Sequence, residues 1–172
     1  MRDAPSDPDG AARSAASHVA APDTAGVLMR PPLLFLVSIA LGCTLEWARS
    51  LPIVPGPLER TLGAPLIASA ALLFALAVRE FQAAGTPLPT RRPTTRIVRT
   101  GPYRFSRNPI YLSFTLLHLG VALWVNGGWL LVTLAVTLVV LTYGVIVREE
   151  RYLARRFGQE YLAYKASVRR WV

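Results

Sequence analysis

Four apolar runs, separated by short polar segments, constrain this chain more than any other feature. A helix needs about 20 apolar residues to cross the hydrocarbon core of a bilayer. Four runs approach that length, at about 32–48, 62–84, 109–125 and 129–148. The first and third are short, so tilt or flanking interfacial residues would have to help them span. We therefore predict an all-α fold, a polytopic membrane bundle of about four transmembrane helices.

The basic residues gather on one side of this predicted bundle. Six arginines fall between the second and third runs, and seven Lys or Arg residues lie at the end of the fourth run or after it, whereas the opposite loops hold only Arg49 and Arg60. Because cytoplasmic loops are enriched in Lys and Arg, we expect both termini in the cytoplasm of a bacterial inner-membrane protein. Anionic headgroups of the bilayer would meet the same residues. The net charge of +9 then requires no nucleic-acid partner.

The two ends of the chain have compositions that differ from the apolar runs. Residues 1–28 are rich in Ala, Ser, Pro and Asp, which predicts a disordered cytoplasmic tail. Residues 29–172 would form one membrane domain. Within 149–172, apolar residues recur at spacings of three and four among basic ones, and Gly158 interrupts the series. This pattern predicts amphipathic C-terminal helices at the cytoplasmic face, with a break at the glycine.

The short connection between the third and fourth runs brings two distant motifs together. Only Asn126, Gly127 and Gly128 separate these runs, which predicts a tight antiparallel helical hairpin. The stretch RTGPYRFSRNPIY at 99–111 should therefore lie beside VREERYLARRFGQEY at 147–161. Gly85 and the prolines within 85–108 predict an irregular loop leading to the first motif.

The pair Asn108 and Pro109 predicts a helix start, with Asn as the capping residue and Pro at the first helical position. Backbone amides at a helix N-terminus also bind carboxylates or phosphates. Arg107 stands directly before this pair. An anionic group could therefore be held at this helix start.

Two adjacent acids, Glu149 and Glu150, close the fourth run, where we expect a helix C-terminus that disfavours negative charge. One interpretation is a set of salt bridges to Arg148, Arg151 or the loop arginines. The other is that one of the two carboxylates receives a cationic or hydroxyl-rich ligand.

Metal ligands are scarce in this sequence. Cys43 is the only cysteine, and His18 and His118 are the only histidines, so we predict no metal site. Cys43 falls inside the first run as a small apolar residue. His118 lies in the third run, where a neutral imidazole bonded to a neighbouring helix is expected, although ionisable groups in membrane helices are also candidates for function.

The sequence GPYRFSRNPIY at 101–111, followed after the hairpin by EERYLARRFGQEYLAYKASVRRW at 149–171, resembles the isoprenylcysteine carboxyl methyltransferase and phospholipid methyltransferase superfamily. The similarity runs from about Leu62 to the C-terminus. Members are small integral-membrane enzymes that use S-adenosylmethionine. The resemblance implies methyl transfer to a lipophilic or membrane-borne acceptor, such as a prenylcysteine carboxylate, a phospholipid amine or another small lipophile.

The same resemblance implies which residues form the site. A Glu would suit the ammonium or ribose hydroxyls of the cofactor, an arginine and helix amides its carboxylate, and tyrosines its sulfonium or adenine. Arg148 would position an anionic acceptor. Many members carry His where this chain has Asn108, and an amide cannot titrate near neutral pH, so we expect Asn108 to bind rather than act as a base. The expected cofactor-binding residues are Ile97, Val98, Tyr103, Arg107, Asn108, Pro109, Tyr111, Glu149 and Glu150.

Two other functions stay open from the sequence. A sterol-type membrane reductase has a similar C-terminal part and would bind NADPH, although such enzymes are usually longer. A non-enzymatic four-helix membrane scaffold would need no cluster of Tyr103, Asn108 and Glu149. The methyl acceptor, and whether O, N or S is methylated, also stay open.

Overall fold

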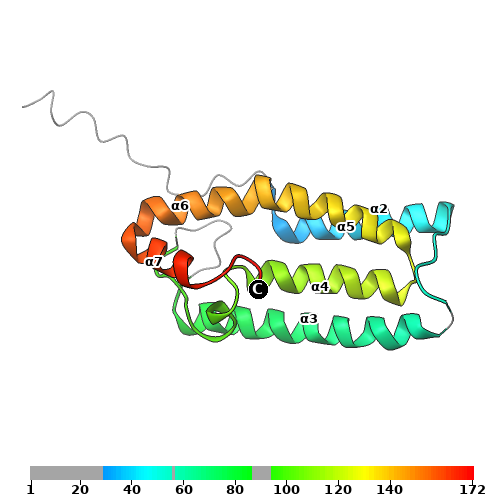
Figure 1. The fold of residues 1–172 in the computed structure, drawn as a ribbon, viewed down its shortest axis with the longest axis horizontal. Coiled ribbons are helices and arrows are strands. Elements are labelled where there is room, and N and C mark those ends of the chain that lie inside the picture. Colours follow the sequence, from blue (N-terminus) through cyan, green and yellow to red (C-terminus); the bar gives the residue numbers. More distant parts are fainter. Residues whose placement is uncertain (1–28, 56, 87–93) are drawn as a thin grey trace, which may run out of the picture.

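The computed structural model describes residues 29–55, 57–86 and 94–172, and the predicted tail at 1–28 lies outside them. Within these residues the fold is all helical, as predicted, with a short 3₁₀ turn at Gly101–Arg104. Figure 1 shows the helices side by side as an elongated bundle. The elements are α2 (Pro31–Ala48), α3 (Leu58–Ala83), α4 (Pro109–Trp124), α5 (Gly128–Leu141), α6 (Val147–Phe157) and α7 (Gln159–Ser167).

The helix that begins at α5 extends beyond the predicted fourth span. A π-helical turn at Thr142–Ile146 joins α5 to α6 without a break, so the helix runs from Gly128 to Phe157. Three helical segments of the described chain are long and apolar enough to cross a membrane: Pro31–Ala48, Leu58–Ala83 and Gly128–Phe157. Helix α4 is also apolar, but it has only 16 residues.

Small residues allow α3 and α4 to pack closely. A Cβ atom added at Gly63 would lie 2.7 Å from the backbone nitrogen of Trp124, and one added at Gly120 would lie 2.8 Å from Cγ1 of Ile67. Close approach of backbones through small residues is a common way for membrane helices to associate. It fixes α4, which carries part of the site, against α3.

Polar contacts inside the bundle join α2 to α5 and α4 to α5. Ser38 donates to the carbonyl of Thr133 at 3.2 Å, and Thr137 donates to Ser38 at 2.6 Å. The predicted bond between His118 and a neighbouring helix is confirmed, because Nε2 of His118 lies 3.0 Å from the carbonyl oxygen of Leu130. Internal pairing of this kind is required where no water is available.

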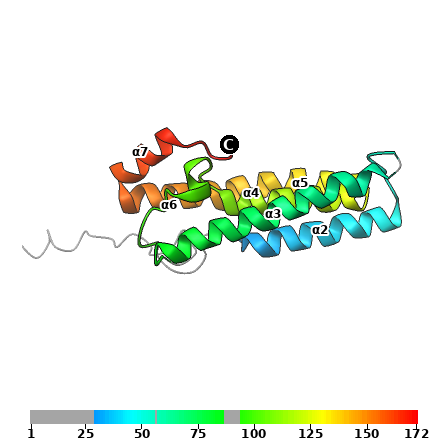
Figure 2. The ribbon, with the colours of Figure 1, turned by 90° about the horizontal axis from the view of Figure 1, so that it is seen from below.

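The predicted hairpin and C-terminal helices are both present. Asn126 takes a positive φ of 53° between α4 and α5, and Gly158 takes a φ of 52° between α6 and α7. After α7 the chain returns to the start of α4, as Figures 1 and 2 show. There the backbone N–H of Arg107 donates to the carbonyl of Arg169 at 3.0 Å. This return brings residues 168–172 against the loop that precedes α4.

Candidate functional site

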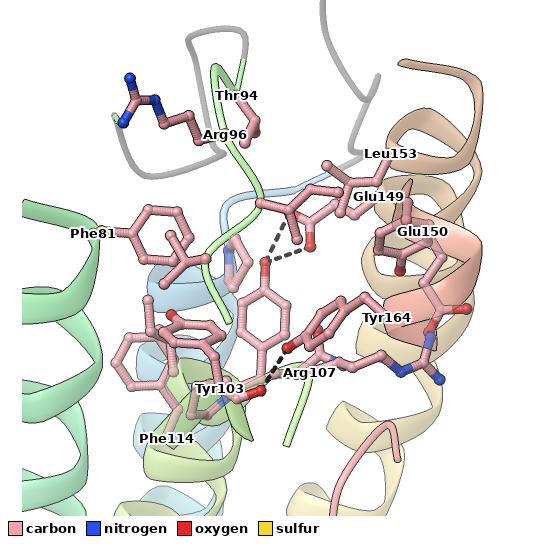
Figure 3. Close-up of a pocket in the computed structure, with 18 of the residues that line it drawn as sticks. Phe81, Thr94, Arg96, Tyr103, Arg107, Phe114, Glu149, Glu150, Leu153 and Tyr164 are labelled. Carbon is pink, nitrogen blue, oxygen red and sulfur yellow. Dashed lines mark hydrogen bonds and ion pairs between the residues drawn. The ribbon is translucent and has the colours of Figure 1, made fainter. Parts of the chain in front are cut away.

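A cavity of about 220 Å³ lies where the loop 94–108 meets α2, α3, α4, α6 and α7. A water molecule in the liquid occupies about 30 Å³, so the cavity has room for part of an organic molecule. All nine residues that the sequence predicted as cofactor-binding line it, namely Ile97, Val98, Tyr103, Arg107, Asn108, Pro109, Tyr111, Glu149 and Glu150. Figure 3 shows the two glutamates entering from the same helix.

Glu149 is a buried carboxylate on the cavity wall. Its side chain accepts hydrogen bonds from the hydroxyl of Tyr111 at 2.8 and 2.9 Å, and the residue is 7% exposed. None of the ion pairs formed within the described residues includes Glu149. The predicted location at a helix C-terminus is wrong, since α6 continues to Phe157 and Glu149 lies in its first turn. Burial without a cation is therefore its main electrostatic feature.

Glu150, the next residue, has a different environment. Its carboxylate lies 3.1 Å from Nη1 of Arg107, 3.3 Å from Nζ of Lys165 and 2.9 Å from Nε of Arg170. The salt-bridge interpretation therefore holds for this glutamate with respect to the loop arginine Arg107, whereas Lys165 and Arg170 are partners that the sequence did not predict. Three cations already neutralise Glu150, so Glu149 is the acid that can receive a further positive group.

Buried polar atoms without a hydrogen-bond partner are concentrated at the cavity. Among the described residues they are Oγ1 of Thr94, Nε and Nη1 of Arg107, and Nδ1 of His118. Thr94 and Arg107 both line the cavity. Arg107 Nη1 is close enough to Glu150 for an ion pair, but its N–H direction does not make a hydrogen bond with it. Because buried polar groups are normally paired, these two residues have capacity for a ligand.

Aromatic side chains form a further part of the wall. The hydroxyl of Tyr164 donates to the carbonyl of Tyr103 at 2.8 Å, and the Tyr103 ring meets Phe81 edge to face at 5.3 Å between centroids. Burial and the neighbouring Tyr161 raise the pKa of Tyr164 to about 12, and burial also raises the pKa of Tyr103. Both phenols are therefore neutral near pH 7, and they offer aromatic faces rather than a base.

Asn108 occupies the predicted position before α4, with Pro109 at the start of the helix, but the predicted side-chain cap is wrong. No cap hydrogen bond forms at this helix. The side-chain amide instead donates to the carbonyl oxygen of Arg170 at 3.1 Å, and Ser106 donates to the same oxygen at 3.3 Å. The side chain therefore donates to a distant carbonyl, brought close by the returning C-terminal segment, and does not accept from a backbone N–H of α4.

The chain is similar in sequence to known proteins. The sequence model of the phospholipid methyltransferase family matches residues 58–160, which is more than half of the chain. The chain belongs to this family. A protein of Haemophilus influenzae described as uncharacterized is 38% identical over 63 residues, which are 37% of this chain and all of that protein. No solved structure matches the chain.

The family model covers every residue that we predicted to bind the cofactor in this phospholipid methyltransferase family member. Arg148, predicted to position the acceptor, is exposed and is not among the residues that line the cavity, so that role stays a prediction. Sequence reasoning missed Thr94, Tyr161 and Tyr164 as lining residues. The spacing of three between the two tyrosines could have revealed them, because it places both on one face of a helix.

We expect the Asn108→Ala variant to lose about 1 kcal/mol of stability, the usual net value of one hydrogen bond, because the amide of Asn108 binds the Arg170 carbonyl in the wild type.

We expect Asn108→His to keep activity. The pH dependence of its rate should show no new ionisation near pH 6.5, which is about the ordinary pKa of His. Unfolding midpoints and rate profiles against pH, with one identified acceptor, check both results. A large gain in turnover for Asn108→His, controlled by an ionisation near neutrality, would show that a base is useful at this position.

Proposed function

We propose that this protein transfers a methyl group from S-adenosylmethionine to a lipophilic acceptor at the membrane. The observation that carries the proposal is Glu149, a buried carboxylate on the cavity wall with no cation beside it among the described residues. Such a group favours a ligand that brings a positive charge or several hydroxyls. The cofactor, when bound, supplies a methyl group activated by attachment to a sulfonium.

The chemistry of the lining residues fits the other parts of the cofactor. Arg107 is nine-tenths buried and has two nitrogens without hydrogen bonds, which suits a carboxylate. The aromatic walls at Tyr103 and Tyr164 suit a sulfonium or an adenine ring. Glu149 would then hold the ammonium or the ribose hydroxyls. A carboxylate, a guanidinium and aromatic rings in one cavity thus match a nucleoside that carries an ammonium, a carboxylate and a sulfonium.

The apolar part of the cavity suits an acceptor with a hydrocarbon body. Phe74 and Phe81 of α3, Phe114 of α4 and Leu153 of α6 line it beside the polar residues. Alignment of two bound reactants and exclusion of water are the main contributions that these residues can make to a displacement at a methyl group. A prenylcysteine carboxylate, a phospholipid amine and other small lipophiles are all acceptors of this kind.

The test uses purified protein in detergent, incubated with methyl-labelled S-adenosylmethionine and host lipid extract. We expect label in an extracted lipophilic product, together with measurable binding of the cofactor by calorimetry. Binding of NADPH instead would favour the reductase interpretation. A folded protein that binds neither cofactor would favour a scaffold.

We further propose that α6 and α7 face the cytoplasm, because the basic residues of the sequence gather there. Single cysteines at two exposed positions, Arg60 and Arg155, test this in a Cys43→Ala background. In intact cells a membrane-impermeant thiol reagent should label Arg60→Cys and leave Arg155→Cys unmodified until the cells are opened. Labelling of Arg155→Cys in intact cells would reverse the orientation.

A further inference from the structure

Thr94 has a hydroxyl whose partner the described residues do not supply. The residue is 4% exposed, it lines the cavity, and its Oγ1 makes no hydrogen bond within the described chain. Burying a hydroxyl without a hydrogen-bond partner destabilises the fold. A valine, which has the same shape with a methyl group in place of the hydroxyl, would avoid this cost. A threonine is therefore an unfavourable choice here unless a bound molecule pairs with it.

Contacts on both sides hold Thr94 in place. The Nε of Arg156 in α6 donates to the backbone carbonyl of Thr94 at 2.8 Å. The next residue, Thr95, donates to Oγ1 of Thr86 from its backbone nitrogen at 3.1 Å and from its hydroxyl at 2.9 Å. These bonds use the backbone of Thr94 and the side chain of Thr95. The Thr94 hydroxyl is left for the cavity.

Arg107 is the other lining residue with buried nitrogens that make no hydrogen bond, although its Nη1 also lies 3.1 Å from Glu150, and it lies away from Thr94. Figure 3 shows Thr94 beside Arg96 at one end of the cavity and Arg107 beside Tyr164 at the other. The guanidinium is positively charged, so it suits an anion. A neutral hydroxyl both donates and accepts, so it suits a group that has both donors and acceptors. The two ends of the cavity thus differ in the chemistry that they can recognise.

We propose that the Thr94 hydroxyl binds the adenosyl end of the cofactor and that Arg107 binds the carboxylate of its amino-acid end. The inference rests on the proposed function and adds the orientation of the ligand. Adenine and ribose carry both donors and acceptors, as the hydroxyl requires. Ile97 and Val98, which follow Thr94 in the same loop and line the cavity, offer apolar surface for a purine. Thr94 is then a residue that selects for the adenosyl group.

The experiment measures the binding of two neutral-sulfur ligands by calorimetry. S-Adenosylhomocysteine has both ends, whereas 5′-methylthioadenosine lacks the amino-acid group. We expect Thr94→Val to weaken both ligands by the same factor, roughly 3- to 10-fold, the usual value of one hydrogen bond. Thr94→Ser, which keeps the hydroxyl, should bind like the wild type. Arg107→Lys, which keeps the charge but not the planar donors, should weaken only S-adenosylhomocysteine.

Stability measurements separate a ligand contact from a structural role. The unfolding midpoint of Thr94→Val without ligand should equal or exceed that of the wild type, because no hydrogen bond within the described chain is lost. Thr95→Val is the matched control. It removes the bond to Thr86, so it should lower the midpoint and weaken the two ligands less than Thr94→Val does.

Three results would overturn the inference. If Thr94→Val binds both ligands like the wild type, the hydroxyl makes no contact with them. If Thr94→Val weakens S-adenosylhomocysteine but not 5′-methylthioadenosine, the orientation is reversed. If the wild type binds neither these ligands nor S-adenosylmethionine, the proposed function fails and this inference fails with it. In the first two cases the proposed function stands.

Discussion

We expect the Glu149→Gln variant to bind S-adenosylmethionine about 10- to 150-fold more weakly than the wild type. This factor corresponds to the roughly 1.5 to 3 kcal/mol of a hydrogen bond to a charged group. The carboxylate is buried on the cavity wall and accepts two short contacts from the single hydroxyl of Tyr111. Gln keeps the size and one acceptor for Tyr111, but it removes the negative charge that an ammonium or ribose hydroxyls would meet.

Although its affinity for the cofactor should fall, the Glu149→Gln variant should not lose stability. A buried carboxylate without a cation is costly to desolvate, so its replacement by an amide should leave the unfolding midpoint unchanged or raise it. Glu160→Gln is the matched control, because Glu160 is exposed, pairs with Arg99 and is not among the residues that line the cavity. It should not change the affinity for the cofactor. A dissociation constant of Glu149→Gln equal to that of the wild type would remove Glu149 from the site.

The sequence predicted the helices well because long apolar segments have few alternatives in a membrane. The predicted end of the fourth apolar helix, at about residue 148, is wrong. Hydropathy falls after Val147, but the backbone hydrogen bonds of a helix do not require apolar side chains, and the helix continues to Phe157. Glu149 consequently lies within a helix, and its environment depends on what packs beside it.

The choice between Glu149 and Glu150 shows what local patterns cannot decide. The two residues are adjacent, so a helix places their side chains about 100° apart. Glu150 meets Lys165 and Arg170 only because the chain bends at Gly158 and returns after α7. The same return gives Asn108 the carbonyl of Arg170 in place of a cap. These contacts link residues about 15 to 60 positions apart, and periodicity within one segment contains no information on them.

We expect Glu150 to contribute to the stability of the fold, whereas Glu149 contributes to ligand binding. Its side chain and that of Arg107 are each 9% exposed, whereas those of Arg170 and Lys165 are 34% and 44% exposed. Arg107 is the most buried partner, and Arg170 adds a bidentate pair through hydrogen bonds of 2.9 and 3.0 Å to the two carboxylate oxygens. Glu150 is therefore one member of a largely buried ionic cluster. Removing one partner of a buried pair typically costs 3 to 5 kcal/mol, because the other charge is left buried without compensation.

We therefore expect Glu150→Gln to lose about 3 kcal/mol of stability, toward the low end because Arg170 and Lys165 are partly hydrated. The unfolding midpoint in detergent, with Glu160→Gln as control, measures this loss. Adding Arg107→Met to Glu150→Gln should recover part of it, since the double variant no longer buries an uncompensated guanidinium. Two results would show that the pair of Arg107 and Glu150 does not hold the loop before α4 against α6. One is a Glu150→Gln variant as stable as the wild type. The other is a double variant that is less stable than Glu150→Gln by as much as Arg107→Met alone destabilises the wild type.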